Sequence, residues 1–217
     1  MTPSTESPRT SPDPRTPWSI RPATTRDADE LLALLEAVAG EGKWIGTQAG
    51  FDRVARLAHM RAMYEDPDRF TGFAVVAGAA PPTPDADAGD PPVSDAGAPD
   101  PPAPDAGATI VGMLGLETPA SGLAELGMML LDGWRGLGLG SLLMTEAVER
   151  ASEAGMHKIA LQVWPHNQAG RALYRKFGFV EEGRLVRHYR RLNGELWDVI
   201  AMGLVLDTTS PGSPFPD

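Results

Sequence analysis

Apolar residues that alternate with polar ones, or that form short continuous runs, predict seven strands along the chain. Five of them are separate, and the last two form a pair joined at Asn193-Gly194, a dipeptide typical of a tight hairpin turn. The predicted strands cover residues 18–22, 70–77, 109–116, 123–131, 158–164 and, as the pair, 180–206.

Apolar residues spaced three and four positions apart predict four helices. The first begins at Thr24, where Asp27 three residues later indicates a cap, and the second covers about residues 51–64. The third begins near Gly138, and the fourth follows Asn167, which can cap its N-terminus. In the third helix the apolar face is predicted to hold Leu139, Leu142, Leu143, Ala147 and Ala151, and the polar face Glu146, Glu149 and Arg150.

Three segments lack periodic apolar positions, and we expect them to be disordered. Residues 1–16 are rich in Pro, Ser and Thr, residues 79–107 are dominated by Pro, Asp, Ala and Gly, and residues 207–217 form the C-terminal tail. The middle segment is an insertion between two strands, which costs little because loop-closure entropy rises only logarithmically with length. A partner-binding role for it is the alternative. Residues 17–206 are expected to form one domain.

Composition and charge exclude some classes of function. The net charge of −10 argues against nucleic acid and anionic membranes as partners, although six of the acidic residues are aspartates of the insertion. The chain has no cysteine, which rules out disulfides, thiolate metal sites and a cysteine nucleophile. No apolar run approaches a membrane span and the N-terminus does not resemble a signal peptide, so we expect a soluble, cytoplasmic protein.

A glycine-rich run, Asp132-Gly-Trp-Arg-Gly-Leu-Gly-Leu-Gly140, joins a predicted strand to the third helix. Glycines at alternate positions let a ligand approach the backbone, and the first N–H groups of a helix have no intrahelical partner. Such a turn suits an anion, and phosphate best. A tight turn that uses glycine only for its dihedral freedom is the alternative. The spacing fits neither a dinucleotide-binding fingerprint nor a Walker A loop.

A second motif follows at a distance that fits the first. The run Asn167-x-x-Gly170-x-x-Leu173-Tyr174-x-x-x-Gly178-Phe179 covers the fourth predicted helix. Together with Arg135-x-x-Gly138-x-Gly140, it resembles the two hallmark segments of the GNAT superfamily of N-acetyltransferases, over about residues 17–206 without the insertion. The resemblance implies an α/β (α+β) fold: a mixed central sheet of about seven strands with a splayed strand pair, flanked by about four helices.

The resemblance also implies a binding site for acetyl-CoA and no metal. Its pyrophosphate would lie on the backbone of Arg135, Gly136, Leu137, Gly138, Leu139, Gly140 and Ser141. Its pantetheine arm would lie between the two splayed strands, against N–H groups at Met128, Met129 and Leu130, with Asn167 as a further partner. The histidines show no spacing with acidic residues that would suggest a metal site.

Acetyl transfer to an amine needs a base for the amine and an acid for the departing thiolate. Tyr174 is the candidate acid, because a phenol keeps its proton at neutral pH. A tyrosine that only packs beside Leu173 is the alternative. Glu125, which interrupts an apolar strand, is the candidate base; a solvated charge at the strand end is the alternative, with water as the base.

The acceptor is less defined by the sequence than the cofactor. By resemblance, Glu41 and Trp44 in the loop after the first helix border the acceptor pocket, although Trp44 as a lid over the core is the alternative. The expected acceptor is a primary amine, in a small molecule or at a protein N-terminus. A non-catalytic acyl-CoA-binding module on the same fold is the competing function. Oligomers are common in the family, so a homodimer is one expected assembly.

Overall fold

The computed structural model describes residues 9–10, 18–77, 108–119 and 121–206. The elements in chain order are β1 (Arg9–Thr10), β2 (Trp18–Pro22), a 3-10 turn (Thr25–Asp27), α1 (Ala28–Gly40), α2 (Arg53–Tyr64), β3 (Phe70–Ala77), β4 (Thr109–Glu117), β5 (Leu123–Leu130), α3 (Leu139–Glu153), β6 (Lys158–Val163), α4 (Gln168–Lys176), β7 (Val180–Arg190) and β8 (Leu196–Val205). The residues expected to be disordered lie outside the described ranges, apart from Arg9 and Thr10.

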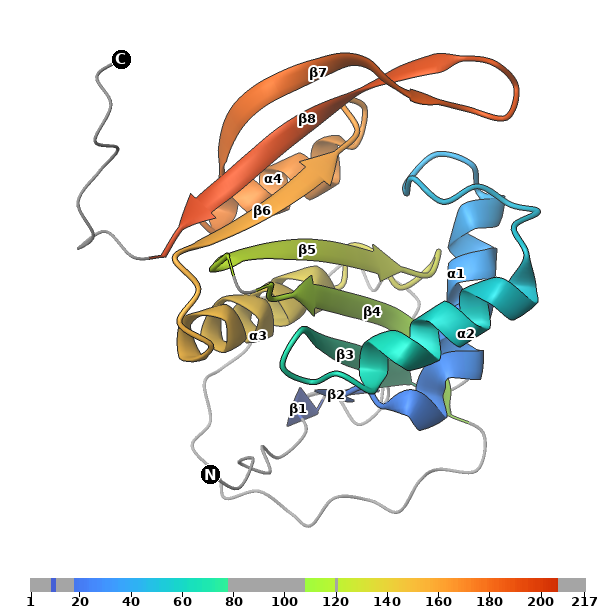
Figure 1. The fold of residues 1–217 in the computed structure, drawn as a ribbon, viewed down its shortest axis with the longest axis vertical. Helices are drawn as coiled ribbons and strands as arrows, with labels where there is room; N and C mark the ends of the chain where they lie inside the picture. The colour runs from blue at the N-terminus through green and yellow to red at the C-terminus, as the bar shows by residue number, and fades with distance from the viewer. Residues whose placement is uncertain (1–8, 11–17, 78–107, 120, 207–217) are drawn as a thin grey trace, which may run out of the picture.

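One mixed sheet of eight strands runs in the order β1-β2-β3-β4-β5-β6-β8-β7. All neighbouring strands pair antiparallel except β5 and β6, which are parallel and pair at only three positions, from Leu123 opposite Lys158 to Glu125 opposite Ala160. Beyond these positions β6, β8 and β7 diverge from β5 (Figure 1). The mixed α/β fold with a splayed strand pair is therefore confirmed, and the two-residue β1 is an additional strand.

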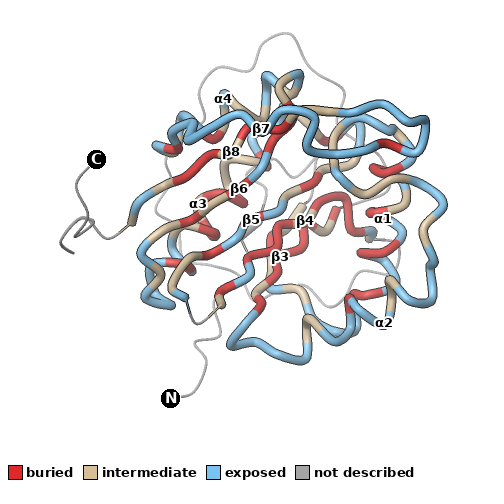
Figure 2. Tube along the Cα trace, turned by 45° about the horizontal axis from the view of Figure 1, so that its top comes forward, coloured by how far each residue is buried: buried red, intermediate tan, exposed pale blue. Residues whose placement is uncertain are grey.

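Helices pack on both faces of the sheet and enclose two hydrophobic cores. On one face α1 buries Leu31, Leu32 and Val38 against β3, β4 and β5. On the other face α3 buries Leu139, Leu143 and Ala147. The strands between these layers are largely buried, whereas β7 at the edge of the sheet is exposed along its length (Figure 2). This arrangement places the splayed strands beside the start of α3 and of α4.

Two local predictions change in the structure. The second helix begins at Arg53 rather than near residue 51, because the Asp52 carboxylate caps it by accepting from the Ala55 N–H at 3.0 Å. Glu146, predicted on the polar face of α3, is only 7% exposed. Within the described residues, no helix is both long and apolar enough to cross a membrane.

Candidate active site

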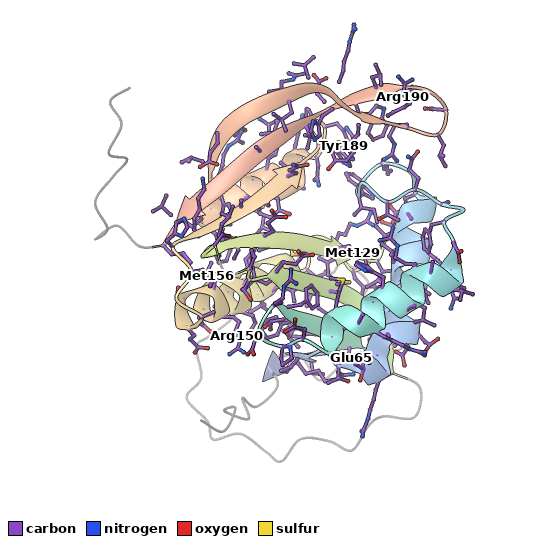
Figure 3. The ribbon with its side chains drawn as sticks, viewed as in Figure 1. Glu65, Met129, Arg150, Met156, Tyr189 and Arg190 are labelled. Carbon is purple, nitrogen blue, oxygen red and sulfur yellow. The ribbon has the colours of Figure 1, made fainter. Side chains whose placement is uncertain are left out.

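The opening between β5 and β6 exposes one edge of β5. The Leu131 N–H donates to the Val111 C=O at 2.8 Å, and Leu130 lies opposite Gly112 in the antiparallel pairing. Because peptide groups alternate in direction along a strand, the Met129 N–H also points toward β4, whereas those of Met128 and Leu130 point toward the opening. Of the three predicted positions, Met128 and Leu130 therefore offer their backbone to a ligand. The Met129 side chain lies against α1 and α2 (Figure 3).

The glycine run forms the turn between β5 and α3, and its glycines have two different functions. Gly136 and Gly138 have φ of 78° and 82°, and a Cβ on either would meet no atom within 4 Å. Gly140 lies in the first turn of α3, where a Cβ would approach the Leu173 side chain to 2.9 Å. Gly136 and Gly138 therefore shape an open turn, and Gly140 allows α3 to pack closely against α4.

The start of α3 is open toward the turn. Gly138 is its N-cap and makes no side-chain hydrogen bond, and its C=O accepts from the Ser141 N–H at 2.9 Å. The amides of Leu139 and Gly140 precede this first bond of the helix. The Leu139 side chain is fully buried in the core and Leu137 is 38% exposed, so these two residues would offer only backbone groups to a ligand.

A pocket of about 310 Å³ brings the two sequence motifs together. Glycine-loop residues form one wall, the open edge of β5 another, and α4 with Asn167 a third. The predicted residues that line it are Trp44, Met128, Met129, Leu130, Arg135, Gly136, Gly138, Gly140, Ser141, Asn167 and Tyr174. Val38, Ile45 and Leu173 also line it, although the sequence did not assign them to the site; of the three, only Leu173 stands in one of the two motifs.

Tyr174 and Asn167 reach this pocket from α4. The Asn167 carboxamide oxygen accepts from the Gly170 N–H at 2.9 Å, as expected for a cap. Tyr174 is 7% exposed, and burial raises the pKa of its phenol to about 12. Its side chain lines both this pocket and a neighbouring one of about 200 Å³ between β5 and β6. The phenol therefore keeps its proton beside the opening of the sheet.

Glu41 and Trp44, predicted to border the acceptor, contact the arginine of the glycine loop. The Arg135 guanidinium donates from Nη1 and Nη2 to the two Glu41 oxygens at 2.8 and 2.5 Å, and it lies 5.2 Å from the Trp44 ring centre. Its Nε donates to the Leu130 C=O at 2.9 Å. The hydrogen bonds from Arg135 hold the pKa of Glu41 below its usual range, against the opposing effect of burial. The guanidinium thus links the glycine loop, β5 and the loop after α1.

Glu125 lies in a different pocket from Tyr174. It lines a pocket of about 400 Å³ between α2 and strands β4 and β5, opposite Glu117 in the β4–β5 register. Arg56 and His59 of α2 line the same pocket. The wall formed by Ile45 and Met128 is shared by all three pockets, so Glu125 and Tyr174 lie on two sides of one opening.

Among the described residues, no group of three or more His, Cys, Asp or Glu side chains is arranged to hold a metal ion. The His166 ring Nε2 lies 2.8 Å from the Lys43 C=O, a structural contact between the loop after α1 and the turn before α4. The site therefore offers backbone amides, one buried phenol and a carboxylate in an adjoining pocket.

Comparison with known proteins shows which family the segment that contains both motifs resembles. The model of the acetyltransferase (GNAT) family matches residues 84–179. Over 67 residues the chain is 33% identical to the N-alpha-acetyltransferase MAK3 of Arabidopsis thaliana; this covers 31% of the chain and spans about a third (34%) of that relative.

Solved structures share the fold over most of the chain. An acetyltransferase-like protein from Acinetobacter baylyi has a TM-score of 0.69 at 20% identity, covering 91% of this chain and 97% of that one. Spermidine N-acetyltransferase from Vibrio cholerae, solved with CoA and spermine, has a TM-score of 0.62 at 20% identity, covering 87% and 95%. At these identities the similarity concerns the fold.

Proposed function

We propose that the chain is an acetyltransferase of the GNAT family and that it transfers the acetyl group of acetyl-CoA to a primary amine. The two substrates would react directly within a ternary complex. The observation that carries the proposal is the pocket of about 310 Å³, because it joins an anion-binding helix start to a buried, protonated phenol.

The residues of this pocket fit acetyl-CoA. A pyrophosphate suits the open amides at the start of α3, where Gly136 and Gly138 leave space for it. The open edge of β5, at Met128 and Leu130, suits the amide groups of a pantetheine arm. When bound, acetyl-CoA supplies an acetyl group activated as a thioester. The Arg135 side chain holds Glu41, so we assign phosphate binding to backbone rather than to this guanidinium.

Tyr174 would donate its proton to the departing thiolate. With a pKa of about 12 it stays protonated at neutral pH and so has a proton to donate. A thiol ionises near a pKa of about 8.5, so transfer to a free thiolate is uphill. The phenol would therefore donate as the C–S bond breaks, and the phenolate would regain a proton from solvent. Its side chain borders the opening from the α4 side. Asn167 caps α4 and thereby fixes the start of the helix that carries Tyr174.

Glu125 would accept the proton of the incoming ammonium, directly or through water. It lies in the pocket of about 400 Å³, which meets the cofactor pocket at Ile45 and Met128. An amine entering there would pass the carboxylates of Glu117 and Glu125 before it reaches the opening. These carboxylates favour a cationic acceptor. A small amine and a protein N-terminus both satisfy that chemistry, and the relatives include an enzyme for each.

An amine panel tests the proposal. The protein is incubated with acetyl-CoA and, in separate reactions, with spermidine, with small aliphatic amines and with peptides that have free N-termini, and the released thiol is measured. The expected result is thiol release that requires one of these amines and saturates with it. Saturable acetyl-CoA binding without amine-dependent release would instead favour the non-catalytic binding module. The cytoplasmic location, the homodimer and the single-domain boundaries stay predictions.

A further inference from the structure

The loop of residues 41–48, between α1 and α2, forms a wall of the three pockets described above, which lie around the opening of the sheet. Ile45 lines the pockets of about 310, 400 and 200 Å³. Trp44 lines the first and third of them, Thr47 the second and Gly46 the third. The position of this loop therefore sets the shape of the space in which cofactor and acceptor would meet.

A buried arginine holds this loop from the far side of the opening. Arg191 follows β7 in the hairpin and is 5% exposed. Its Nη1 donates to the Gly46 C=O at 3.2 Å and its Nη2 to the Gly42 C=O at 3.2 Å. The guanidinium also stacks on Trp197, 4.4 Å from the ring centre. Backbone carbonyls and a ring face thus compensate a buried cation, which would otherwise be costly.

Two further contacts join the same loop to the second half of the sheet. The Leu192 N–H donates to the Gln48 side chain at 2.7 Å, and His166 contacts the Lys43 C=O. At its other end the loop is joined to the glycine loop through Glu41 and Arg135. The loop is therefore a bridge between two sheet halves that pair at only three positions, and Arg191 is its most buried anchor.

We propose that Arg191 is a positioning residue that fixes loop 41–48 as the acceptor-side wall of the opening. The inference rests on the proposed function. Within the part of the chain that the structure describes, the side-chain hydrogen bonds of Arg191 go to the loop of residues 41–48 and not to the glycine loop or the start of α3, and the Glu41–Arg135 pair would remain when Arg191 is changed. Its loss should therefore weaken use of the acceptor and leave acetyl-CoA binding nearly unchanged.

The test compares three variants. Arg191→Met keeps an unbranched apolar stem but removes the charge and the donors, whereas Arg191→Lys keeps the charge but cannot span both carbonyls in a planar fork. Arg190→Met is the matched control, because Arg190 is the exposed neighbour on β7 (Figure 3). The acceptor probes are spermidine and a peptide with a free N-terminal alanine. Folding is checked by circular dichroism and thermal unfolding.

We expect the substitution of Arg191 to affect the acceptor and acetyl-CoA differently. In Arg191→Met, the acceptor KM should rise on the order of tenfold or more, because small displacements of positioning groups cost this much, while the acetyl-CoA Kd changes less than about twofold. Arg191→Lys should be intermediate and Arg190→Met unchanged. An acceptor KM unchanged in Arg191→Met would overturn the proposal. So would an equal loss of acetyl-CoA affinity, since that indicates a general structural role.

Hydrogen exchange gives a readout that does not depend on activity. Amides of residues 42–48 should exchange faster in Arg191→Met than in Arg190→Met, with no change at the start of α3. If the wild-type protein releases no thiol with any amine, the proposed function fails, and exchange still tests the anchor. Unchanged exchange in residues 42–48 would then overturn the role of Arg191, and faster exchange confined to them would support it.

Discussion

The cofactor side and the acceptor side of the opening are built in different ways. The cofactor side consists of local backbone features: left-handed glycines, an uncapped helix start and an asparagine cap. The acceptor side depends on side-chain contacts between residues 94 to 149 positions apart, such as Arg135 with Glu41 and Arg191 with Gly42. Local features can be recognised in a sequence, whereas contacts of this range require the fold. The following substitutions test this division.

The largest effect is expected for Tyr174→Phe. The variant keeps the ring and its packing near Phe179 but removes the phenolic proton that Tyr174 brings to the pocket. Loss of a general acid typically lowers turnover about 10²- to 10⁴-fold, so we expect kcat to fall by at least about 10² while the acetyl-CoA Kd is retained. Measurement of thiol release with saturating substrates checks this.

Tyr64→Phe is the matched control for Tyr174→Phe. The Tyr64 hydroxyl is buried and has no hydrogen-bond partner among the described residues, and its ring packs edge-on against Phe70 at 5.0 Å. Its removal should leave kcat unchanged and leave stability equal or up to about 1 kcal/mol higher, because an unpaired buried hydroxyl is costly. An equal loss of kcat in both variants would show that packing, not the proton, is responsible.

The pH dependence of the reaction rate is a second test of the role of Tyr174. Since burial raises its pKa to about 12, the phenol stays protonated as the pH rises through 10. The pH–rate profile should therefore contain no basic limb from Tyr174 below about pH 10, the ordinary pKa of a tyrosine. A basic limb near pH 8 that disappears in Tyr174→Phe would contradict this assignment.

Glu125→Gln should have the second-largest effect. The amide keeps the size of the side chain in the pocket of about 400 Å³ but cannot accept a proton. We expect kcat/KM for the amine to fall about tenfold, at the low end for a general base because water can take its place, and the acidic limb of the pH–rate profile to shift. Glu117→Gln, on the opposite strand, removes a negative charge from the same pocket but not the proposed base, so it is the control for the effect of charge on amine binding. An unaltered profile in Glu125→Gln would exclude this residue as the base.

Gly138→Ala should weaken cofactor binding through the backbone. Gly138 has φ of 82°, where a side chain costs about 1–2 kcal/mol, and its Cβ would enter the open turn. Gly194→Ala in the hairpin is the matched control, because Gly194 has φ of 87° and a Cβ on it would also meet no atom within 4 Å. Both variants should lose similar stability in urea unfolding. Only Gly138→Ala should raise the acetyl-CoA Kd, by about tenfold; an equal rise in both would contradict the anion site.

Features that depend on nearby residues could be predicted from the sequence, whereas features that depend on distant contacts could not. Strands β2 and β3 and the cap at Asn167 lie where the apolar pattern and the turn residues placed them, because each depends on neighbours within a few positions. The burial of Glu146 was missed, because it depends on which elements cover α3. The reason for Gly140 was also missed: its contact, Leu173, lies on another helix.

The candidate site divides in the same way. The residue types around the cofactor pocket could be predicted from the two motifs, because the residues of each motif lie within a few positions of one another in the sequence. The separation of Glu125 and Tyr174 into adjoining pockets was not, since it depends on where the sheet opens. Arg191 carried no signal at all in the sequence: an arginine after an exposed strand is ordinarily solvated, and only the fold brings Trp197 and the carbonyls of loop 41–48 around it.

The smallest effect is expected for Glu41→Gln, which probes the link between the two sides. The pKa of Glu41 is lowered in the folded protein, chiefly by the hydrogen bonds from Arg135. A lowered pKa means that the carboxylate stabilises the fold above its unfolded pKa of about 4.3, and that this contribution disappears as the pH falls through the folded value. The free energy of unfolding should therefore drop by about 0.5–1 kcal/mol in Glu41→Gln at pH 7.

The wild-type protein and Glu41→Gln should converge as the pH falls through the lowered pKa of Glu41, since both then carry a neutral side chain at position 41. Urea unfolding at pH 7 and at a series of acidic pH values measures the difference. Glu36→Gln is the control, because the Glu36–Arg53 pair is also an ion pair but both side chains are more than 40% exposed, so its loss should cost less at pH 7. A difference between wild type and Glu41→Gln that does not shrink as the pH falls would mean that the carboxylate charge does not hold Arg135. The loop of residues 41–48 would then depend on its contacts with the second half of the sheet, of which Arg191 is the most buried.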